Sequence, residues 1–200
     1  MLVFWKEKLV LLSVPKTGTS ALEAALRNRA DAVLENPPEL KHVPMFRYNR
    51  FLKPLFGVLD GERRFETMAV IREPVSWLGS WYRYRSRPEL DGRPNSTSGI
   101  DFNAFVQAYL ADPRPPFANV GSPRKFVSNG QGKVAVKHLF QYEELDLAAR
   151  FLEDRLKVRL DLTAQNVSPK RPLDLAPGTE SSLRDVCAEE FHLWEKARRG

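Results

Sequence analysis

The chain has 200 residues, of which 42% are hydrophobic and 28% are charged, and it carries a formal net charge of +6. This composition is typical of a globular protein and excludes collagen-like, coiled-coil and wholly disordered chains. The length predicts a single domain over residues 1–200, and the positive charge favours an anionic partner such as phosphate, sulfate, a polyanionic glycan, nucleic acid or a membrane surface.

Strands alternate with helices along the chain, as in βαβ units. Strands are expected at residues 8–14, 67–71 and 134–142. The helices that follow these strands are expected at residues 20–28, 75–87 and 145–156. The first run is continuously apolar, which is typical of a central strand in a parallel sheet. Pro74 stands where a first-turn proline is tolerated in a helix.

The remaining segments are expected to form loops and two further helices. Polar residues 88–99 and 112–132 predict loops, and Asp101 is the expected cap of a helix over residues 101–110. Residues 166–178, which contain three prolines, predict an extended surface excursion, and residues 180–196 predict a final helix. The whole pattern predicts a three-layer α/β domain, P-loop NTPase-like, with a mostly parallel central sheet flanked by helices. Its ligands are expected at the carboxyl ends of the first two strands.

The longest apolar stretch near the N-terminus, residues 9–14, is too short for a membrane span or for the core of a signal peptide. We therefore expect no membrane partner. A single cysteine, Cys187, excludes an intramolecular disulfide and a cysteine-based zinc cage. A reducing compartment is the expected setting, and the sequence predicts a cytoplasmic protein.

A loop suited to anion binding joins the first expected strand to the first expected helix. Its residues are Pro15, Lys16, Thr17, Gly18, Thr19 and Ser20. A glycine turn at this point aims backbone N–H groups and the positive helix end at one small volume. Gly18 permits the turn, Lys16 adds a mobile positive charge, and the three hydroxyl side chains add donors. An ordinary βα turn with a surface lysine is the alternative interpretation.

The order of residues in this loop differs from that of the Walker A nucleotide loop. There a lysine follows the last glycine, whereas Lys16 comes two positions before Gly18. The second strand closes with Ile71, Arg72 and Glu73 instead of the aspartate that would hold magnesium. These differences disfavour a small P-loop kinase, which is kept as an alternative function, and no metal site is expected.

Arg72 stands at the carboxyl end of the second expected strand, where ligands of open α/β sheets bind. Ser80 follows on the next helix, in one stripe with Ser76, Arg83 and Arg87. An arginine with a nearby hydroxyl suits a phosphate, because guanidinium can bind two phosphate oxygens at once. Two anion sites beside one sheet predict a bisphosphate ligand.

The segments Pro15-Lys-Thr-Gly-Thr-Ser20 and Arg72-Glu-Pro74, with Ser80 and Tyr82, resemble the two cofactor signatures of sulfotransferases that use 3′-phosphoadenylyl sulfate (PAPS). The pattern is most similar to bacterial and carbohydrate-type members. The resemblance implies that the first segment binds the 5′-phosphosulfate and that Arg72 with Ser80 binds the 3′-phosphate. It also implies PAPS as cosubstrate, without a metal.

Further parts of the chain resemble landmarks of this family. They are Lys41-His42, Phe140-Gln-Tyr-Glu143 and Asn166-Val-Ser-Pro169. The membrane anchor of luminal animal enzymes and the Arg-Lys-Gly tail of cytosolic sulfotransferases are not evident. Arg124-Lys125 is a possible substitute for that tail, and its role in cofactor binding is left open.

Sulfuryl transfer depends chiefly on positioning and on stabilisation of the charge that grows on the leaving phosphate. By the resemblance, Lys16 neutralises the leaving oxygen. An alcohol acceptor needs a base, and His42 is the first choice because imidazole titrates near neutrality. Glu73 and Glu143 compete for this role. The alternative interpretation of His42 is a loop histidine that stays solvated or caps the next helix. A sugar or glycan hydroxyl is the expected acceptor, since the placement of His42 resembles that in carbohydrate enzymes.

Other chemically active residues are expected to be structural. His138 lies inside an apolar strand and Cys187 on the last helix, which favours a satisfied core histidine and an inert buried thiol. The net charge with Trp77 and Trp81 suggests a non-catalytic nucleic-acid-binding domain as a third hypothesis. Aromatic residues at helical spacing usually pack in a core, so no nucleic-acid partner is expected.

Overall fold

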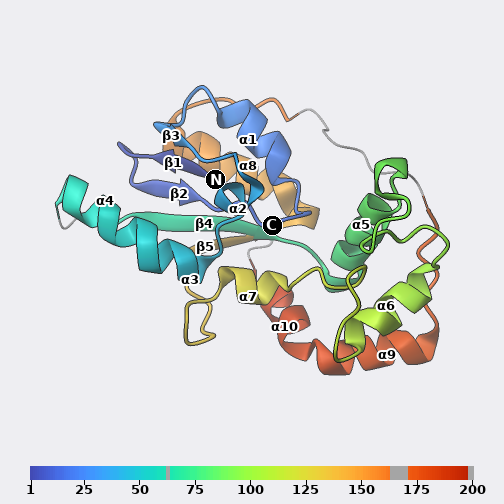
Figure 1. The fold of residues 1–200 in the computed structure, drawn as a ribbon. Helices are drawn as coiled ribbons and strands as arrows, with labels where there is room; N and C mark the ends of the chain where they lie inside the picture. The colour runs from blue at the N-terminus through green and yellow to red at the C-terminus, as the bar shows by residue number, and fades with distance from the viewer. Residues whose placement is uncertain (62–63, 163–170, 198–200) are drawn as a thin grey trace. The chain divides into compact units, whose positions relative to one another are not determined.

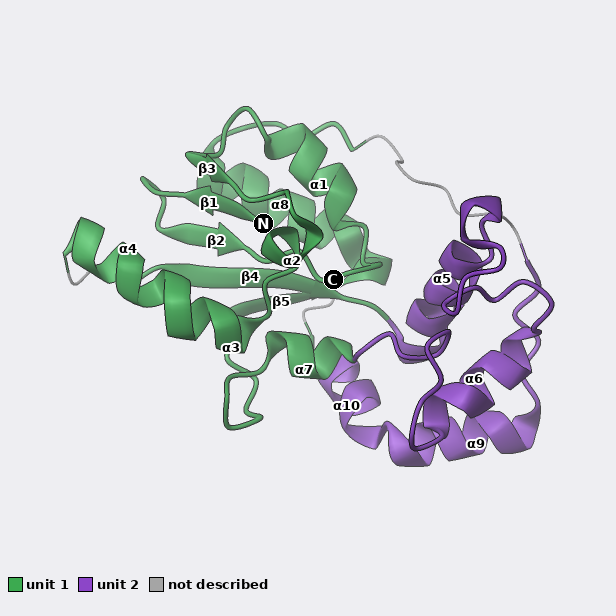
Figure 2. Cartoon of the chain, viewed as in Figure 1, with its two compact units in different colours: residues 1–72, 122–165, 196–200 green, residues 73–121, 166–195 purple. Residues whose placement is uncertain are grey.

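The computed structural model describes residues 1–61, 64–162 and 171–197 (Figure 1). The chain forms two compact units (Figure 2). Unit 1 comprises residues 1–72, 122–165 and 196–200, and unit 2 comprises residues 73–121 and 166–195. Each unit has a hydrophobic core of its own. The single domain expected over residues 1–200 stays a prediction.

Unit 1 is built from a sheet and the helices around it. Its strands are β1 (Leu2–Phe4), β2 (Leu9–Leu11), β3 (Ala32–Val33), β4 (Glu66–Ile71) and β5 (His138–Gln141). Its helices are α1 (Thr19–Leu26), α2 (Pro38–Lys41), α3 (Met45–Arg47), the π-helix η1 (Tyr48–Leu52), α4 (Lys53–Asp60), α7 (Pro123–Val127), the 3-10 turn η3 (Tyr142–Glu144) and α8 (Leu145–Leu156).

Within the described residues, the strands form one mixed sheet in the order β3-β1-β2-β4-β5. The pairs β2–β4 and β4–β5 are parallel, and the pairs β1–β2 and β1–β3 are antiparallel. The expected α/β class is confirmed, but the expectation of a mostly parallel sheet is wrong. The difference arises from β1, a strand that was not predicted. A short turn joins β1 to β2, and two strands joined by so short a turn pair antiparallel.

The core of unit 1 lies between the sheet and two helices. Leu22 of α1 and Leu152 of α8 pack with Leu11, Met68 and Phe140 of the strands. In Figure 1, α8 lies behind the strands, and α3 and α4 lie in front of them. Side chains alternate between the two faces of a strand, so a sheet flanked in this way is apolar on both faces. The near-complete burial of β2 and β4 reflects this arrangement.

Unit 2 is helical. Its elements are α5 (Pro74–Arg85), the 3-10 turn η2 (Pro88–Leu90), α6 (Phe102–Leu110), α9 (Pro177–Val186) and α10 (Ala188–Lys196), of which the last residue belongs to unit 1. Trp77, Tyr82, Phe105 and Leu183 pack in its core. The expected cap of α6 is confirmed, since the Asp101 carboxylate accepts the N–H of Ala104 at 2.7 Å.

The structure corrects several expected elements. The first strand covers only residues 9–11 of 8–14, and β5 is shorter than residues 134–142. The expected helix over residues 180–196 is two helices that meet at Cys187, where no glycine or proline marks the break. Residues 38–60, without any expected element, form short helices, and α7 lies inside the expected loop 112–132. α2 and α7 are too short for their periodicity to be detected, and Pro54 and Gly57 interrupt the helical pattern of residues 45–60.

The segment expected as a proline-rich excursion is described from residue 171 onward. Residues 171–176 form neither helix nor strand, as expected, and α9 begins at Pro177. Residues 166–170 lie outside the described residues. None of the helices that the structure describes is long and apolar enough to cross a membrane.

Candidate functional site

The loop that follows β2 has a backbone conformation suited to binding an anion. Lys16 and Gly18 have φ angles of 67° and 71°, in the left-handed region. Glycine adopts this region freely, whereas for a lysine it costs about 1–3 kcal/mol. Lys8 and Lys157 share this conformation outside the site, so the loop is distinguished by having two such residues beside a helix N-terminus. Left-handed residues in alternation along a loop are typical of backbone concavities that bind anions.

The loop leads directly into the N-terminus of α1. Gly18 is the N-cap residue and has no side chain with which to accept the first N–H groups of the helix. The N–H of Ala21 donates to the carbonyl oxygen of Gly18 at 3.0 Å. The positive end of the helix dipole is left to water or to an anion. Ser20, in the first turn of α1, is half-buried.

Two of the expected phosphate-binding hydroxyls are used by the loop itself. Thr17 and Thr19 both donate their hydroxyl protons to the carbonyl oxygen of Val14, at 2.9 and 3.3 Å. A threonine hydroxyl has one proton, so it can donate to a phosphate only after this bond is broken. Both side chains are buried, and in this conformation they hold the loop closed.

Arg72 reaches the loop from the neighbouring strand. Since β2 and β4 are parallel neighbours, their carboxyl ends open at one edge of the sheet. Nη1 of Arg72 lies 3.5 Å from the carbonyl oxygen of Lys16. Arg72, which is expected to bind the 3′-phosphate, thus lies beside the loop that is expected to bind the 5′-phosphosulfate.

Tyr142 is a site residue to which the sequence assigned no role. It follows β5, the next parallel strand, and the guanidinium carbon of Arg72 lies 4.3 Å from the centre of its ring. It also packs on Gly18, where an added Cβ would lie 2.7 Å from Cε2 of Tyr142. Tyr142 thereby orients Arg72 and closes one side of the loop. Its position as the last residue of the third expected strand was the available signal.

His42 lies against the same strand end. Its Nδ1 is 2.7 Å from the carbonyl oxygen of Ser13, which can only accept a hydrogen bond. Nδ1 therefore carries the proton, and Nε2 has the lone pair that a general base requires. Burial lowers the pKa of His42, which keeps the ring neutral near pH 7. This half-buried, hydrogen-bonded ring does not fit the alternative of a solvated loop histidine.

Glu23 holds the strand end to which His42 is bonded. Its carboxylate accepts hydrogen bonds from the amino group of Met1 at 2.8 Å and from the hydroxyl of Ser13, and it forms an ion pair with Nζ of Lys41 at 2.9 Å. Burial raises the pKa of Glu23, but the bonds from Met1 and Ser13 outweigh it, and the pKa is lowered. Glu23 is thus a charged residue at pH 7, and the sequence alone had not marked it or Ser13.

The remaining expected site residues fall in different places. Ser80 lies on α5 of unit 2, so its pairing with Arg72 stays a prediction. Glu73 accepts the N–H of Ser76 at 2.6 Å and caps α5, a structural task that disfavours it as the base. Glu143 lies in η3 and Arg124-Lys125 on α7, both in unit 1. The segment 166–169 lies outside the described residues.

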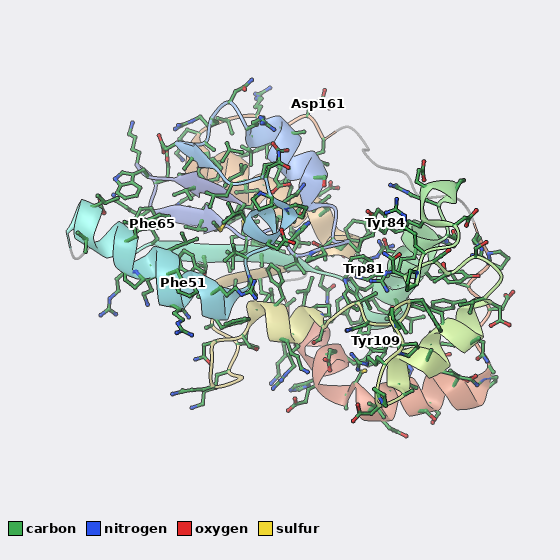
Figure 3. The ribbon with its side chains drawn as sticks, viewed as in Figure 1. Phe51, Phe65, Trp81, Tyr84, Tyr109 and Asp161 are labelled. Carbon is green, nitrogen blue, oxygen red and sulfur yellow. The ribbon has the colours of Figure 1, made fainter. Side chains whose placement is uncertain are left out.

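The expected burial of His138, Cys187 and Trp77 is confirmed, whereas Trp81 is only partly buried. Nε2 of His138 lies 2.9 Å from Glu66, and its ring packs on Phe151. Cys187 is buried, and burial raises the pKa of its thiol to about 11. Trp77 is buried in the core of unit 2, in edge-to-face contact with Trp81. Figure 3 labels Trp81 in this aromatic group, together with Tyr84 and Tyr109.

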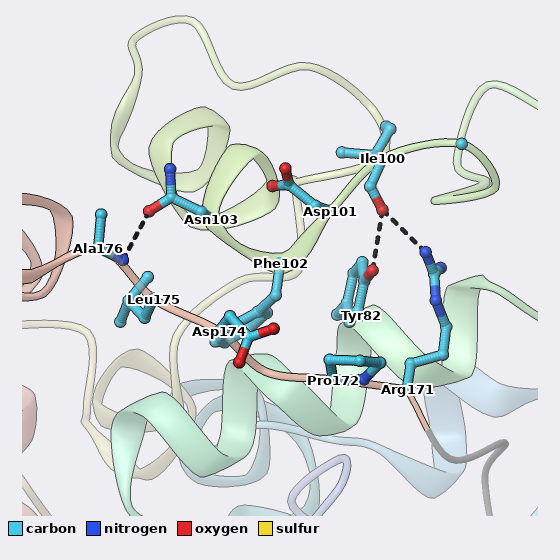
Figure 4. Close-up of a pocket in the computed structure, with 11 residues that line it drawn as sticks. Tyr82, Ile100, Asp101, Phe102, Asn103, Arg171, Pro172, Asp174, Leu175 and Ala176 are labelled. Atoms are coloured by element: carbon cyan, nitrogen blue, oxygen red, sulfur yellow. Dashed lines mark hydrogen bonds between the residues drawn. The ribbon is translucent and has the colours of Figure 1, made fainter.

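Unit 2 contains a hollow of about 630 Å³ (Figure 4). Its walls are joined by internal hydrogen bonds: the carbonyl oxygen of Ile100 accepts from Tyr82 at 2.9 Å and from Arg171 at 3.0 Å. Asn103 accepts the N–H of Ala176 at 3.0 Å. These bonds attach residues 171–176 to α5 and α6, so the polar groups that make them serve the fold of the unit.

Three parallel neighbours, β2, β4 and β5, therefore bring the Lys16 loop, Arg72 and Tyr142 to one edge of the sheet, and His42 lies against Ser13 at the same strand end. The functional conclusion depends on this geometry and on the motifs. No family model, curated protein or solved structure that was compared with the chain matches it.

Proposed function

We propose that this protein is a PAPS-dependent sulfotransferase that transfers a sulfuryl group to an acceptor hydroxyl, with a sugar or glycan as the preferred acceptor. The observation that carries the proposal is that Arg72 lies beside the Lys16 carbonyl and that His42 is hydrogen-bonded to Ser13, two residues before the loop begins. The strand, loop and helix order supports a P-loop-like domain. The single buried cysteine supports a reducing setting such as the cytoplasm.

Binding of the cosubstrate would use two positive regions. The backbone N–H groups around Gly18, the first turn of α1 with Ser20, and Lys16 would bind the 5′-phosphosulfate. Arg72, oriented by the ring of Tyr142, would bind the 3′-phosphate. The two groups are close enough in unit 1 for one nucleotide to contact both, because Arg72 lies beside the Lys16 carbonyl.

The transfer step requires a base and stabilisation of the leaving group. Nε2 of His42 would take the acceptor's hydroxyl proton as the acceptor oxygen forms its bond to sulfur. The bond from sulfur to the phosphate oxygen breaks, and 3′,5′-bisphosphoadenosine leaves with the negative charge. Lys16 and the loop N–H groups would stabilise that charge, and loss of one such donor typically costs about 100- to 1,000-fold in rate.

Calorimetric titration with 3′,5′-bisphosphoadenosine, with AMP and with ATP plus magnesium tests the proposal. We expect the bisphosphate to bind much more tightly than AMP without metal, and Arg72→Ala to remove the difference. Arg150→Ala, which removes an exposed arginine from α8, is the matched control and should bind like the wild type. Preference for ATP with magnesium would instead support the kinase alternative. Binding of none of the nucleotides, with Arg72→Ala unchanged, would contradict the proposal.

A further inference from the structure

The helical segment of residues 45–60, which comprises α3, η1 and α4, is attached to unit 1 by one side only. Tyr48 and Phe56 are buried on that side. Phe56 contacts the rings of Trp5 and Phe65 at centroid distances of 5.5 and 5.1 Å. An ion pair between Lys8 and Asp60 holds the end of α4. These contacts attach one side of the segment to the rest of unit 1.

The other side of the segment exposes large apolar side chains. The exposed fractions are 42% for Phe46, 60% for Phe51, 50% for Leu55, 83% for Val58 and 65% for Leu59. The last four are spaced as i, i+4, i+7 and i+8, which places them on one stripe of a helix. Figure 3 labels Phe51 on this segment. Contiguous exposed apolar surface of this kind marks an interaction site.

The charge of this surface indicates the kind of partner. Arg47, Arg50 and Lys53 are exposed, and residues 45–59 contain no acidic residue. Arg47 and Arg50 lie over the rings of Phe46 and Phe51, at 5.7 and 5.2 Å. Every other exposed residue from 46 to 59 is apolar, glycine or proline. Protein interfaces are also enriched in Phe and Arg, but their cores are depleted in charged residues. Three cations without an acidic residue, set among Phe, Leu and Val, match helices in the surface of an anionic bilayer.

We propose that the segment 45–60 binds the surface of membranes that contain anionic phospholipids. Phe51, Leu55, Val58 and Leu59 would enter the headgroup region, and the three basic residues would contact lipid phosphates. Such binding is peripheral and needs no membrane-spanning helix. It is independent of the proposed sulfotransferase activity, because no residue of the segment belongs to the nucleotide site.

Flotation of the full chain with lipid vesicles tests this inference. Vesicles of phosphatidylcholine alone are compared with vesicles that also contain phosphatidylglycerol, each at low and high salt. We expect the chain to float only with the anionic vesicles and less at high salt. Val58→Ser with Leu59→Ser should weaken binding at least about tenfold. Arg50→Gln with Lys53→Gln should weaken it about fivefold for each charge removed.

Matched controls separate the segment from exposed side chains in general. Val186→Ser removes an equally exposed apolar side chain from α9, and Arg150→Gln a charge from α8; both should bind like the wild type. Thermal unfolding should be unchanged in all variants, since the altered side chains are exposed. If a double variant unfolds, Val58→Ser alone, at the most exposed position, is used instead.

Three results would overturn the inference. One is a chain that stays in solution with both vesicle types. Another is equal flotation of the wild type and the Val58→Ser, Leu59→Ser variant. The third is a chain that light scattering shows to be a dimer, which that variant converts to a monomer without any vesicle binding, since the surface would then bind a second copy.

Discussion

His42 combines the tautomer and the charge that a general base needs. Because burial lowers its pKa, the ring is neutral above a pH that lies below the ordinary value of 6.5. A base acts only when unprotonated, so kcat/KM should rise with pH and reach its plateau by about pH 7. His42→Ala should lower the rate by about 100- to 10,000-fold and leave affinity for 3′,5′-bisphosphoadenosine unchanged.

The measurement is a pH profile of sulfuryl transfer for both proteins, with calorimetry as the control for binding. The rise of kcat/KM with pH that the wild type shows below its plateau should be absent from the residual activity of His42→Ala. A variant that transfers sulfate at the wild-type rate would remove His42 from the mechanism and return Glu143 as the competing base.

The start of α1 and the turn η3 pack against each other through Gly18 and Tyr142. An alanine at position 18 would have a strained φ of 71° and a Cβ 2.7 Å from the Tyr142 ring. Gly18→Ala should therefore cost about 1–3 kcal/mol in the free energy of unfolding. By displacing the ring, it should also weaken bisphosphate binding, since Arg72 loses its support.

A double-mutant cycle with Tyr142→Ala separates the clash from the strain. In the Tyr142→Ala background the clash is absent and only the backbone strain is left, so Gly18→Ala should cost less there. Urea unfolding of the four proteins measures this difference. Equal costs in the two backgrounds would show that Tyr142 does not restrict the loop.

The whole chain carries a net charge of +6, and the proposed ligand is a polyanion. A ligand that binds only the folded protein stabilises it by about 2.7 kcal/mol at 100 times its Kd. Saturating 3′,5′-bisphosphoadenosine should therefore raise the Tm of the wild type, more at low salt than at high salt, because salt screens the attraction. Calorimetric scanning checks this. Arg72→Ala should lose most of the shift, and an equal shift in that variant would contradict the assignment of Arg72.

Local chemistry made part of the fold predictable. β4 was recognised as a continuous apolar run, and α8 because its apolar residues recur with a helical period. The Asp101 cap was recognised because a carboxylate there reaches an N–H three residues on. The break at Cys187 and the strand β1 escaped prediction. Neither has a local signal, since the break contains no glycine or proline and β1 is only three residues long.

The sequence by itself determined the glycine turn that joins β2 to α1, because its glycine, lysine and following helix are adjacent in the chain. It also determined the position of Arg72 at a strand end. Only the tertiary structure decided that Tyr142 supports Arg72, that Ser13 sets the tautomer of His42, and that Thr17 and Thr19 turn their hydroxyls inward. It also decided which side of residues 45–60 stays exposed. Most of these contacts join residues far apart in sequence, and even the local threonine bonds depend on backbone angles that composition and spacing leave open.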